Sequence, residues 1–166
     1  FNLMFLITKK EYSYFDKQIL VPFGEFVPLR NLFGFMEYIS GSHDFAEGTK
    51  ERNLQSNNIK ILPVICYEIL FFWKLLNKSN INSDIIVNIT NDSWFGDFSG
   101  PYQHFYFAKL RAAEFNKTLI RVSVNGISAG IDNFGKVIKF STLNQQQNKI
   151  ISIPISSNNN QYIKFH

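Results

Sequence analysis

Short apolar runs recur along the chain, and polar or turn-forming stretches separate them. Runs of about four to eight residues that are rich in Ile, Val and Leu are typical of β-strands. We expect strands at residues 1–7, 59–66, 84–90, 119–124, 127–131, 137–140 and 150–155. The run at 1–7 indicates a buried strand, and the continuous apolar centre of 84–90 indicates burial on both faces of a sheet.

A helical period of apolar residues is clearest from Pro101 to Lys117, where apolar side chains recur at steps of three and four. The proline lies in the first turn, the position that best tolerates it. Helices are also expected at residues 68–77 and 31–38.

Turn-forming residues divide these elements. Two prolines and a glycine within residues 21–29 exclude a helix there and predict a stiffened loop. Residues 41–58 are also predicted to form a loop, and residues 132–135 a tight turn that joins two strands as a hairpin. Strands that alternate with helices indicate an α/β fold, and the hairpin favours a mixed sheet over a purely parallel one.

Composition narrows the class of protein. The 166 residues suit one globular domain, with 45% hydrophobic and 18% charged residues. The net charge is only +4 and the basic residues are scattered along the chain, so nucleic-acid binding has little support. A single cysteine excludes an intrachain disulfide framework and a cysteine-based zinc cluster. No apolar run reaches the roughly 18 residues that span a bilayer.

The only cysteine, Cys66, ends the predicted strand at 59–66 and precedes the predicted helix at 68–77. Strand, sharp turn and helix form the geometry that lifts a nucleophile above the end of a sheet. A thiol in that position attacks an acyl carbon when a neighbouring cation or base favours the thiolate. The alternative interpretation is that Cys66 is a small buried hydrophobe.

Six blocks of sequence carry a family resemblance. They are residues 14–17 (YFDK) with 21–29 (VPFGEFVPL), 65–69 (ICYEI), 91–96 (NDSWFG), 100–104 (GPYQH), 111–114 (RAAE) and 125–128 (NGIS). In this order they resemble the apolipoprotein N-acyltransferases, a membrane branch of the nitrilase (carbon–nitrogen hydrolase) superfamily. The likeness extends from about residue 2 to about residue 140.

The resemblance implies a four-layer α-β-β-α sandwich that is incomplete at its N-terminus. On this basis residues 1–156 are a partial carbon–nitrogen hydrolase domain, and residues 157–166 are a polar C-terminal tail. The resemblance also implies a location at the bacterial inner membrane, with the catalytic domain on the periplasmic face. Membrane contact would be made through transmembrane segments that this chain lacks.

The family's chemistry uses a Glu-Lys-Cys triad. The resemblance implies that Cys66 takes an acyl chain from a phospholipid as a thioester, and that Lys17 favours the thiolate and stabilises the oxyanion. The backbone N–H of Tyr67 is the expected second oxyanion donor. Glu25 and Glu68 match glutamates near the reacting centre, where they hold Lys17 or shape the acyl pocket. The acyl chain then passes to the N-terminal amine of an apolipoprotein.

Two departures from the family pattern affect this expectation. The triad glutamate lies in a Pro-Glu block upstream of the lysine segment and is absent from this chain, so we expect low activity from the chain alone. Val124 stands where the family usually has an asparagine. No metal or organic cofactor is expected, because nucleophile, cation and base suffice for acyl transfer.

Alternative interpretations stay open for the whole chain and for single residues. The chain as a whole has two: a soluble nitrilase-type amidase, and an inactive remnant of a split gene. Lys17 is alternatively a solvated surface lysine, Glu25 a loop cap, and Glu68 an N-cap or a partner of the helix dipole. His104 is expected to be a structural hydrogen-bonding residue, and no catalytic role is assigned to it.

Overall fold

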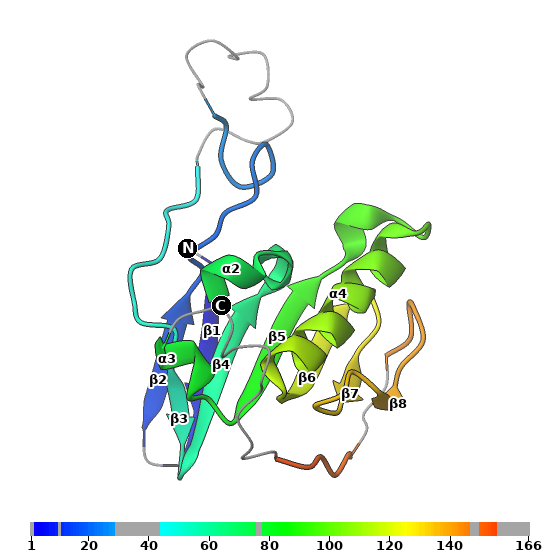
Figure 1. Ribbon diagram of the computed structural model, residues 1–166. Helices are drawn as coiled ribbons and strands as arrows, with labels where there is room; N and C mark the ends of the chain where they lie inside the picture. Colours follow the sequence, from blue (N-terminus) through cyan, green and yellow to red (C-terminus); the bar gives the residue numbers. More distant parts are fainter. Residues whose placement is uncertain (1, 10, 29–43, 76–77, 147–149, 156–166) are drawn as a thin grey trace.

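A computed structural model describes residues 2–9, 11–28, 44–75, 78–146 and 150–155. Its centre is a six-stranded mixed sheet in the order β3-β4-β5-β6-β7-β8 (Figure 1). The strands span Leu54–Ser56 (β3), Ile59–Ile65 (β4), Ile85–Asn91 (β5), Thr118–Val124 (β6), Ala129–Ile131 (β7) and Val137–Phe140 (β8). β4, β5 and β6 run parallel, whereas β3, β7 and β8 are antiparallel to their neighbours. The expected mixed sheet is therefore confirmed.

Helices cover one face of this sheet (Figure 1). They are η2 (Cys66–Leu70, 3-10), α2 (Phe72–Leu75), α3 (Lys78–Ile81) and α4 (Gly100–Phe115), whereas η3 (Ser93–Phe95, 3-10) has no buried residue and follows the end of β5. Ala108 and Ala112 of α4 are fully buried against Leu62, Ile86 and Leu119 of the sheet. Small alanines at this spacing allow the helix to approach the strands closely. Because this face of α4 packs on the sheet, its apolar residues recur at the helical period that the sequence shows.

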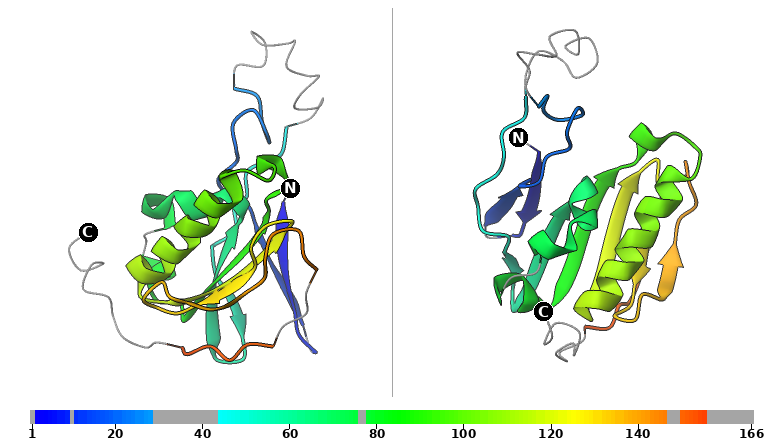
Figure 2. Two further views of the ribbon diagram at one scale, coloured as in Figure 1. Left: turned by 90° about the vertical axis from the view of Figure 1, so that its right-hand side faces the viewer. Right: turned by 45° about the horizontal axis from the view of Figure 1, so that its top comes forward.

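A separate hairpin covers part of the opposite face (Figure 2). Its strands, β1 (Leu3–Ile7) and β2 (Tyr12–Asp16), pair antiparallel. Met4 and Phe15 point inward and form a second core with residues of β3, β4 and β5. The first strand is not buried throughout, because Ile7 is 78% exposed and the outer side chains of β1 face away from the sheet. The described residues thus form helix, sheet and hairpin layers.

Three predictions of local structure were wrong. The helix expected at 68–77 is divided at Phe71 into η2 and α2. The loop expected at 41–58 contains the short strand β3. No strand forms at 150–155; instead Ile151 and Ile153 pack over Gly130, which has no side chain to oppose them. The helix expected at 31–38 and the tail at 157–166 lie outside the described residues.

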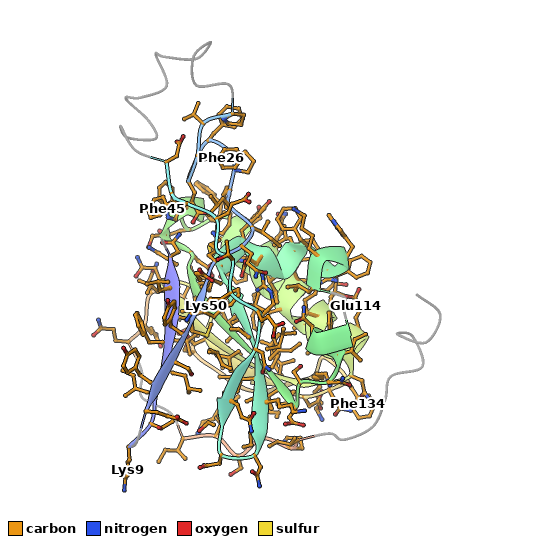
Figure 3. All side chains as sticks on the ribbon, turned by 90° about the vertical axis from the view of Figure 1, so that its left-hand side faces the viewer. Lys9, Phe26, Phe45, Lys50, Glu114 and Phe134 are labelled. Carbon is orange, nitrogen blue, oxygen red and sulfur yellow. The ribbon has the colours of Figure 1, made fainter. Side chains whose placement is uncertain are left out.

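Two loop segments lie side by side beyond the carboxyl ends of the parallel strands, and they carry Phe26 and Phe45 far from Lys9 at the hairpin turn (Figure 3). Backbone hydrogen bonds join them, from the N–H of Phe45 to the carbonyl of Glu25 and from the N–H of Gly48 to the carbonyl of Lys17. A Cβ on Gly48 would lie 2.4 Å from the carbonyl oxygen of Asp16, so only glycine permits this approach. The pairing fixes the segment that carries Lys17 and Glu25.

Candidate active site

Cys66 stands on a strained turn at the end of β4. Its φ angle is +53°, in the left-handed region that residues with a side chain rarely adopt. The backbone then enters η2 at once, so strand, turn and helix meet at this residue. A half-buried thiol on a strained strand-to-helix turn is the geometry of a nucleophile elbow.

Glu68 joins the turn of Cys66 to the segment that follows Lys17. Its Oε1 accepts the backbone N–H groups of Gln18 (2.9 Å) and Ile19 (3.1 Å). Its Oε2 accepts the N–H of Ile65 (2.8 Å), which is the capping contact considered as its alternative role. Glu68 therefore holds the peptides beside Lys17 and Cys66 and does not bond the Lys17 ammonium itself.

Arg52 is the counter-ion of Glu68. Both carboxylate oxygens of Glu68 accept guanidinium N–H groups at 2.8 Å, and both side chains are buried. Arg52 also donates to the carbonyl of Pro63 (2.8 Å) and stacks over the ring of Phe15 at 4.5 Å. This planar, bidentate pairing requires arginine. The pair ties together β2, β4 and η2 beneath the site.

Lys17 is 1% exposed, which excludes the interpretation of a solvated surface lysine. Its Nζ lies 2.5 Å from Oε2 of Glu25, and this oxygen also accepts the N–H of Val21 (2.8 Å). The other carboxylate oxygen accepts the side-chain amide of Asn2. Glu25 therefore both closes its own loop and holds the ammonium in place.

Lys17, Glu25, Cys66 and Tyr67 border a single cavity of about 660 Å³. The cavity is lined by Asn2, Leu3, Lys17, Val21, Gly24, Glu25, Phe45, Ile65, Cys66, Tyr67, Ile89, Thr90, Asn91, Trp94, Phe95, Val122 and Val124. Most of these side chains are apolar, so the polar groups of Lys17 and Glu25 belong to a mainly apolar cavity surface. Among the described residues, Glu68 does not line the cavity.

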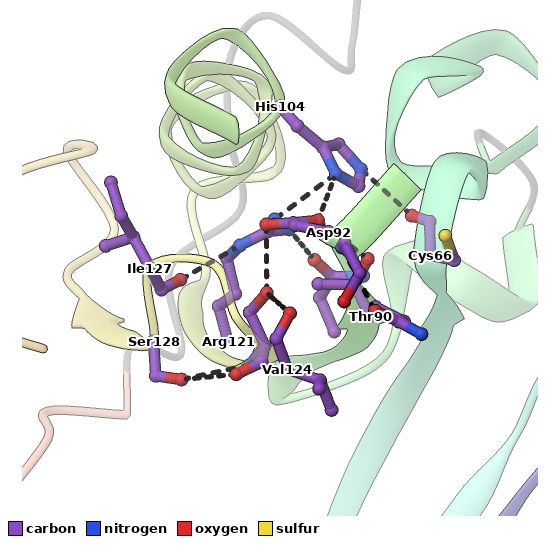
Figure 4. A network of polar contacts seen from close by, with 12 residues as sticks. Cys66, Thr90, Asp92, His104, Arg121, Val124, Ile127 and Ser128 are labelled. Carbon is purple, nitrogen blue, oxygen red and sulfur yellow. Dashed lines mark hydrogen bonds and ion pairs between the residues drawn. The ribbon is translucent and has the colours of Figure 1, made fainter. Parts of the chain in front are cut away.

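A buried network of polar side chains lies behind Cys66 (Figure 4). Asp92, which follows β5, is its centre. Its Oδ1 lies 2.8 Å from Nδ1 of His104, and its Oδ2 accepts from Arg121 (2.7 Å) and from the hydroxyl of Ser123 (2.9 Å). Nε2 of His104 lies 3.3 Å from the carbonyl oxygen of Cys66. The network thus joins β6 and α4 to the nucleophile turn.

Charge and burial act in opposite directions on Asp92. Burial alone raises the pKa of its carboxyl group, but the hydrogen bond from His104 and the charge of Arg121 outweigh it and lower the pKa from 3.8 to about 2. Burial lowers the pKa of Arg121, although Asp92 and Cys66 oppose that change. The Asp92 carboxylate is therefore ionised throughout the neutral range.

The lowered pKa of Asp92 predicts a pH dependence of stability. The folded protein binds this proton less tightly than the unfolded chain, so the stabilisation is complete above about pH 4 to 5 and is lost as the pH falls to 2. A shift from 3.8 to about 2 corresponds to about 2 kcal/mol in the free energy of unfolding. Urea unfolding at several pH values, with ¹³C NMR titration of the carboxyl group, measures it. A midpoint near 3.8 for Asp92 in the folded protein would contradict the expectation.

Sequence reasoning missed Arg52, Asp92 and Arg121, and it assigned His104 no role beyond hydrogen bonding. A local signal exists only for Asp92, which stands at a strand end inside the block at 91–96. The block at 125–128 receives an explanation from the structure. A Cβ on Gly126 would lie 2.0 Å from Oδ2 of Asp92, so the glycine makes room for the network.

The described residues contain no group of three or more His, Cys, Asp or Glu side chains placed to bind a metal ion. No helix in the described part of the chain combines the length and apolar character that a membrane crossing needs.

Comparisons with known proteins agree on one family. A model of the carbon–nitrogen hydrolase family matches residues 7–163. The apolipoprotein N-acyltransferase of Rickettsia typhi is 40% identical over 148 residues, which are 87% of this chain and 30% of that protein. That of Rhizobium rhizogenes is 40% identical over 136 residues, or 79% of this chain and 25% of that protein. The chain therefore spans less than a third of these curated relatives.

Solved structures show the same fold at low identity. A CN-hydrolase superfamily protein from Xanthomonas campestris is 18% identical, with a TM-score of 0.62 over 88% of this chain and 54% of that chain. An amidase from Nesterenkonia sp. is 14% identical, with a TM-score of 0.53 over 79% of this chain and 46% of that chain. At this identity the likeness shows the α/β fold of the nitrilase superfamily and nothing about substrate.

Proposed function

Since this chain belongs to the carbon–nitrogen hydrolase family, we propose that it carries the nucleophile part of an apolipoprotein N-acyltransferase site. In this proposal Cys66 accepts a fatty acyl chain from a phospholipid and passes it to the N-terminal amine of an apolipoprotein. The observation that carries the proposal is the shared cavity. A strained thiol, a buried ammonium and apolar walls meet in it.

The first half-reaction forms a thioester. The sulfur of Cys66 attacks the acyl carbonyl carbon, and the thiol proton passes to a carboxylate base, which the family resemblance assigns to a glutamate outside this chain. The ammonium of Lys17 and the N–H of Tyr67 stabilise the oxyanion of the tetrahedral intermediate. The lysophospholipid oxygen then leaves and takes up the proton. Glu25 positions Lys17 through its 2.5 Å contact.

The second half-reaction consumes the thioester. The amine of the apolipoprotein attacks the thioester carbon, an amide bond forms, and the C–S bond breaks. The amine loses a proton and the sulfur is regenerated as a thiol or thiolate. Val122 and Val124, both more than half exposed, and Leu3 provide apolar cavity wall for the alkyl chain of the acyl group.

Identity to the acyltransferases supports this substrate class over a small amide. Two relatives of that name reach 40% identity, whereas the amidase reaches 14%. We also propose that the complete domain is a four-layer α-β-β-α sandwich, of which residues 1–156 are a part, and that residues 157–166 are a tail. The proposal also includes action at the periplasmic face of the bacterial inner membrane.

Mass spectrometry of the intact chain tests the proposal. We expect incubation with phosphatidylethanolamine vesicles, or with the activated donor p-nitrophenyl palmitate, to add one acyl chain to Cys66. The activated donor has a leaving group that departs without protonation, so a missing base matters less for it. Hydroxylamine should remove the adduct, because it cleaves thioesters rapidly.

The Cys66→Ser variant is the control, since Cys66 is the only cysteine. An adduct of equal yield on this variant would contradict the role of the thiol. Hydrolysis of a small amide without any acyl adduct would favour the amidase alternative. Absence of both reactions would favour an inactive remnant.

A further inference from the structure

Asn2 lies opposite Lys17 in the hairpin of β1 and β2. The register of the two strands pairs Leu3 with Asp16, so one further step along each chain segment places Asn2 beside Lys17. The backbone N–H of Lys17 donates to the carbonyl oxygen of Asn2 at 2.9 Å. The antiparallel pairing therefore continues beyond the two strands and ends at the lysine that borders the cavity of Cys66.

The side chain of Asn2 contacts the ion-pair partner of Lys17. Its amide nitrogen donates to Oε1 of Glu25. The other carboxylate oxygen, Oε2, accepts from the Lys17 ammonium and from the N–H of Val21. The Glu25 carboxylate thus has donors on both of its oxygens. It cannot rotate, or move away from the ammonium, without losing a hydrogen bond.

These contacts of Asn2 are not those of a local turn or cap. Asparagine side chains in turns and caps bind backbone groups a few residues away. Here the partner is a side chain 23 positions further along the chain, and it is ionised. Hydrogen bonds to an ionised group are stronger than those between neutral groups. Asn2 is half-buried and lines the same cavity as Lys17, Glu25 and Cys66, so water only partly screens this contact.

We propose that Asn2 is a positioning residue of the acyl-transfer site and holds both members of the Lys17–Glu25 ion pair. Its carbonyl fixes the backbone of Lys17, and its amide fixes the carboxylate that in turn holds the Lys17 ammonium. The inference rests on the proposed function, in which that ammonium stabilises an oxyanion at Cys66. Such a donor acts only when it is held in place, since a displacement of about 1 Å in a catalytic site can cost about 100-fold in rate.

The first experiment measures the acylation of Cys66 in the Asn2→Leu variant. Leucine has the same branched shape as asparagine and keeps the backbone carbonyl, but it has no amide N–H to donate. Mass spectrometry follows adduct formation at increasing concentrations of p-nitrophenyl butyrate, a short activated donor. We expect the limiting rate to fall about tenfold, because Glu25 loses a hydrogen bond to its charged group. The half-saturating donor concentration should change less than about twofold.

This division between limiting rate and half-saturation separates positioning from substrate contact. An unchanged limiting rate with a higher half-saturating concentration would show that Asn2 binds the donor, and it would overturn the proposal. Asn58→Leu is the matched control, because Asn58 is an exposed asparagine between β3 and β4, and it should leave both quantities unchanged.

A double-variant cycle tests whether Asn2 acts through Glu25. In a Glu25→Met background the amide of Asn2 has no carboxylate to hold, so adding Asn2→Leu should slow acylation by less than about twofold. The same tenfold loss in both backgrounds would mean that Asn2 acts independently of Glu25, and it would overturn the proposal. Circular dichroism and urea unfolding compare the folding of the four chains. The midpoint of unfolding should show the same pattern, with a smaller loss from Asn2→Leu once Glu25 is replaced.

A measurement on the parent chain does not depend on whether a variant folds. Nuclear Overhauser NMR spectra should show contacts between the side-chain amide protons of Asn2 and the γ-protons of Glu25, and their absence would overturn the proposal. A parent chain that shows these contacts but forms no acyl adduct would refute the proposed function and leave the grip of Asn2 on the ion pair intact. An adduct that forms at the parent rate in Asn2→Leu would refute only this inference.

Discussion

Replacing Lys17 by methionine is expected to slow the acylation of Cys66 by p-nitrophenyl palmitate by about 100- to 1,000-fold. The reason is the loss of one preorganised oxyanion donor, an effect of that size in other acyl-transfer sites. Lys17 is almost completely buried and borders the same cavity as the thiol, so water cannot easily replace its charge. Methionine has a similar length and shape and keeps the packing. The initial rate of adduct formation, followed by mass spectrometry, measures the effect.

The substitution also leaves the carboxylate of Glu25 without its cation. The double variant Lys17→Met/Glu25→Gln removes both charges and should be at least as slow, with less loss of stability. Lys50→Met is the matched control, because Lys50 is exposed and stacks on the ring of Tyr14. If Lys17→Met were acylated at the rate of the parent, Lys17 would not act on the oxyanion.

Much of the sheet was predictable because its strands have local signals. The parallel strands β4, β5 and β6 appear as continuous apolar runs, and the turn between β7 and β8 has the residues that a tight turn needs. Cys66 was predictable as a candidate for the same reason, since a single cysteine at the boundary between a strand and a helix is visible in one window of sequence.

Local sequence patterns did not predict that Lys17 borders the same cavity as Cys66. The two residues are 49 positions apart, and Glu68, Arg52 and the close contact at Gly48 bring their segments together. The family resemblance identified Lys17 and Glu25, because a family pattern includes residues that the fold brings together even when they are far apart in the sequence. Arg52 lies outside the matching blocks, so nothing in the sequence distinguished it from a surface residue.

Buried polar networks are hard to predict for a related reason. Asp92, His104 and Arg121 come from three different elements, and each alone has the properties of an ordinary surface or capping residue. Only the parallel arrangement of β5 and β6, with α4 packed across them, places the three side chains together. The error at 150–155 has the same origin. Packing of Ile151 on Gly130 replaced strand pairing there, and the pattern of apolar residues does not distinguish the two outcomes.

The largest effect on stability is expected from Glu68→Gln, which should lower the free energy of unfolding by about 3 to 5 kcal/mol. Glutamine keeps the volume but removes the negative charge, so the Arg52 guanidinium stays buried without a counter-ion. The amide also replaces one acceptor by a donor, and Glu68 accepts from Arg52 and from backbone N–H groups on both of its oxygens. Urea unfolding followed by circular dichroism measures the change.

Glu51→Gln is the matched control, since Glu51 is exposed and adjacent to Arg52 in sequence, and it should cost less than about 0.5 kcal/mol. Arg52→Met/Glu68→Gln removes both charges and should recover part of the loss, because an apolar side chain can replace a buried ion pair at little cost. A single-variant cost below about 1 kcal/mol would contradict a central role for Glu68. Since Glu68 joins the peptides that flank Lys17 and Cys66, a folded Glu68→Gln chain should also form the palmitoyl adduct more slowly than the parent.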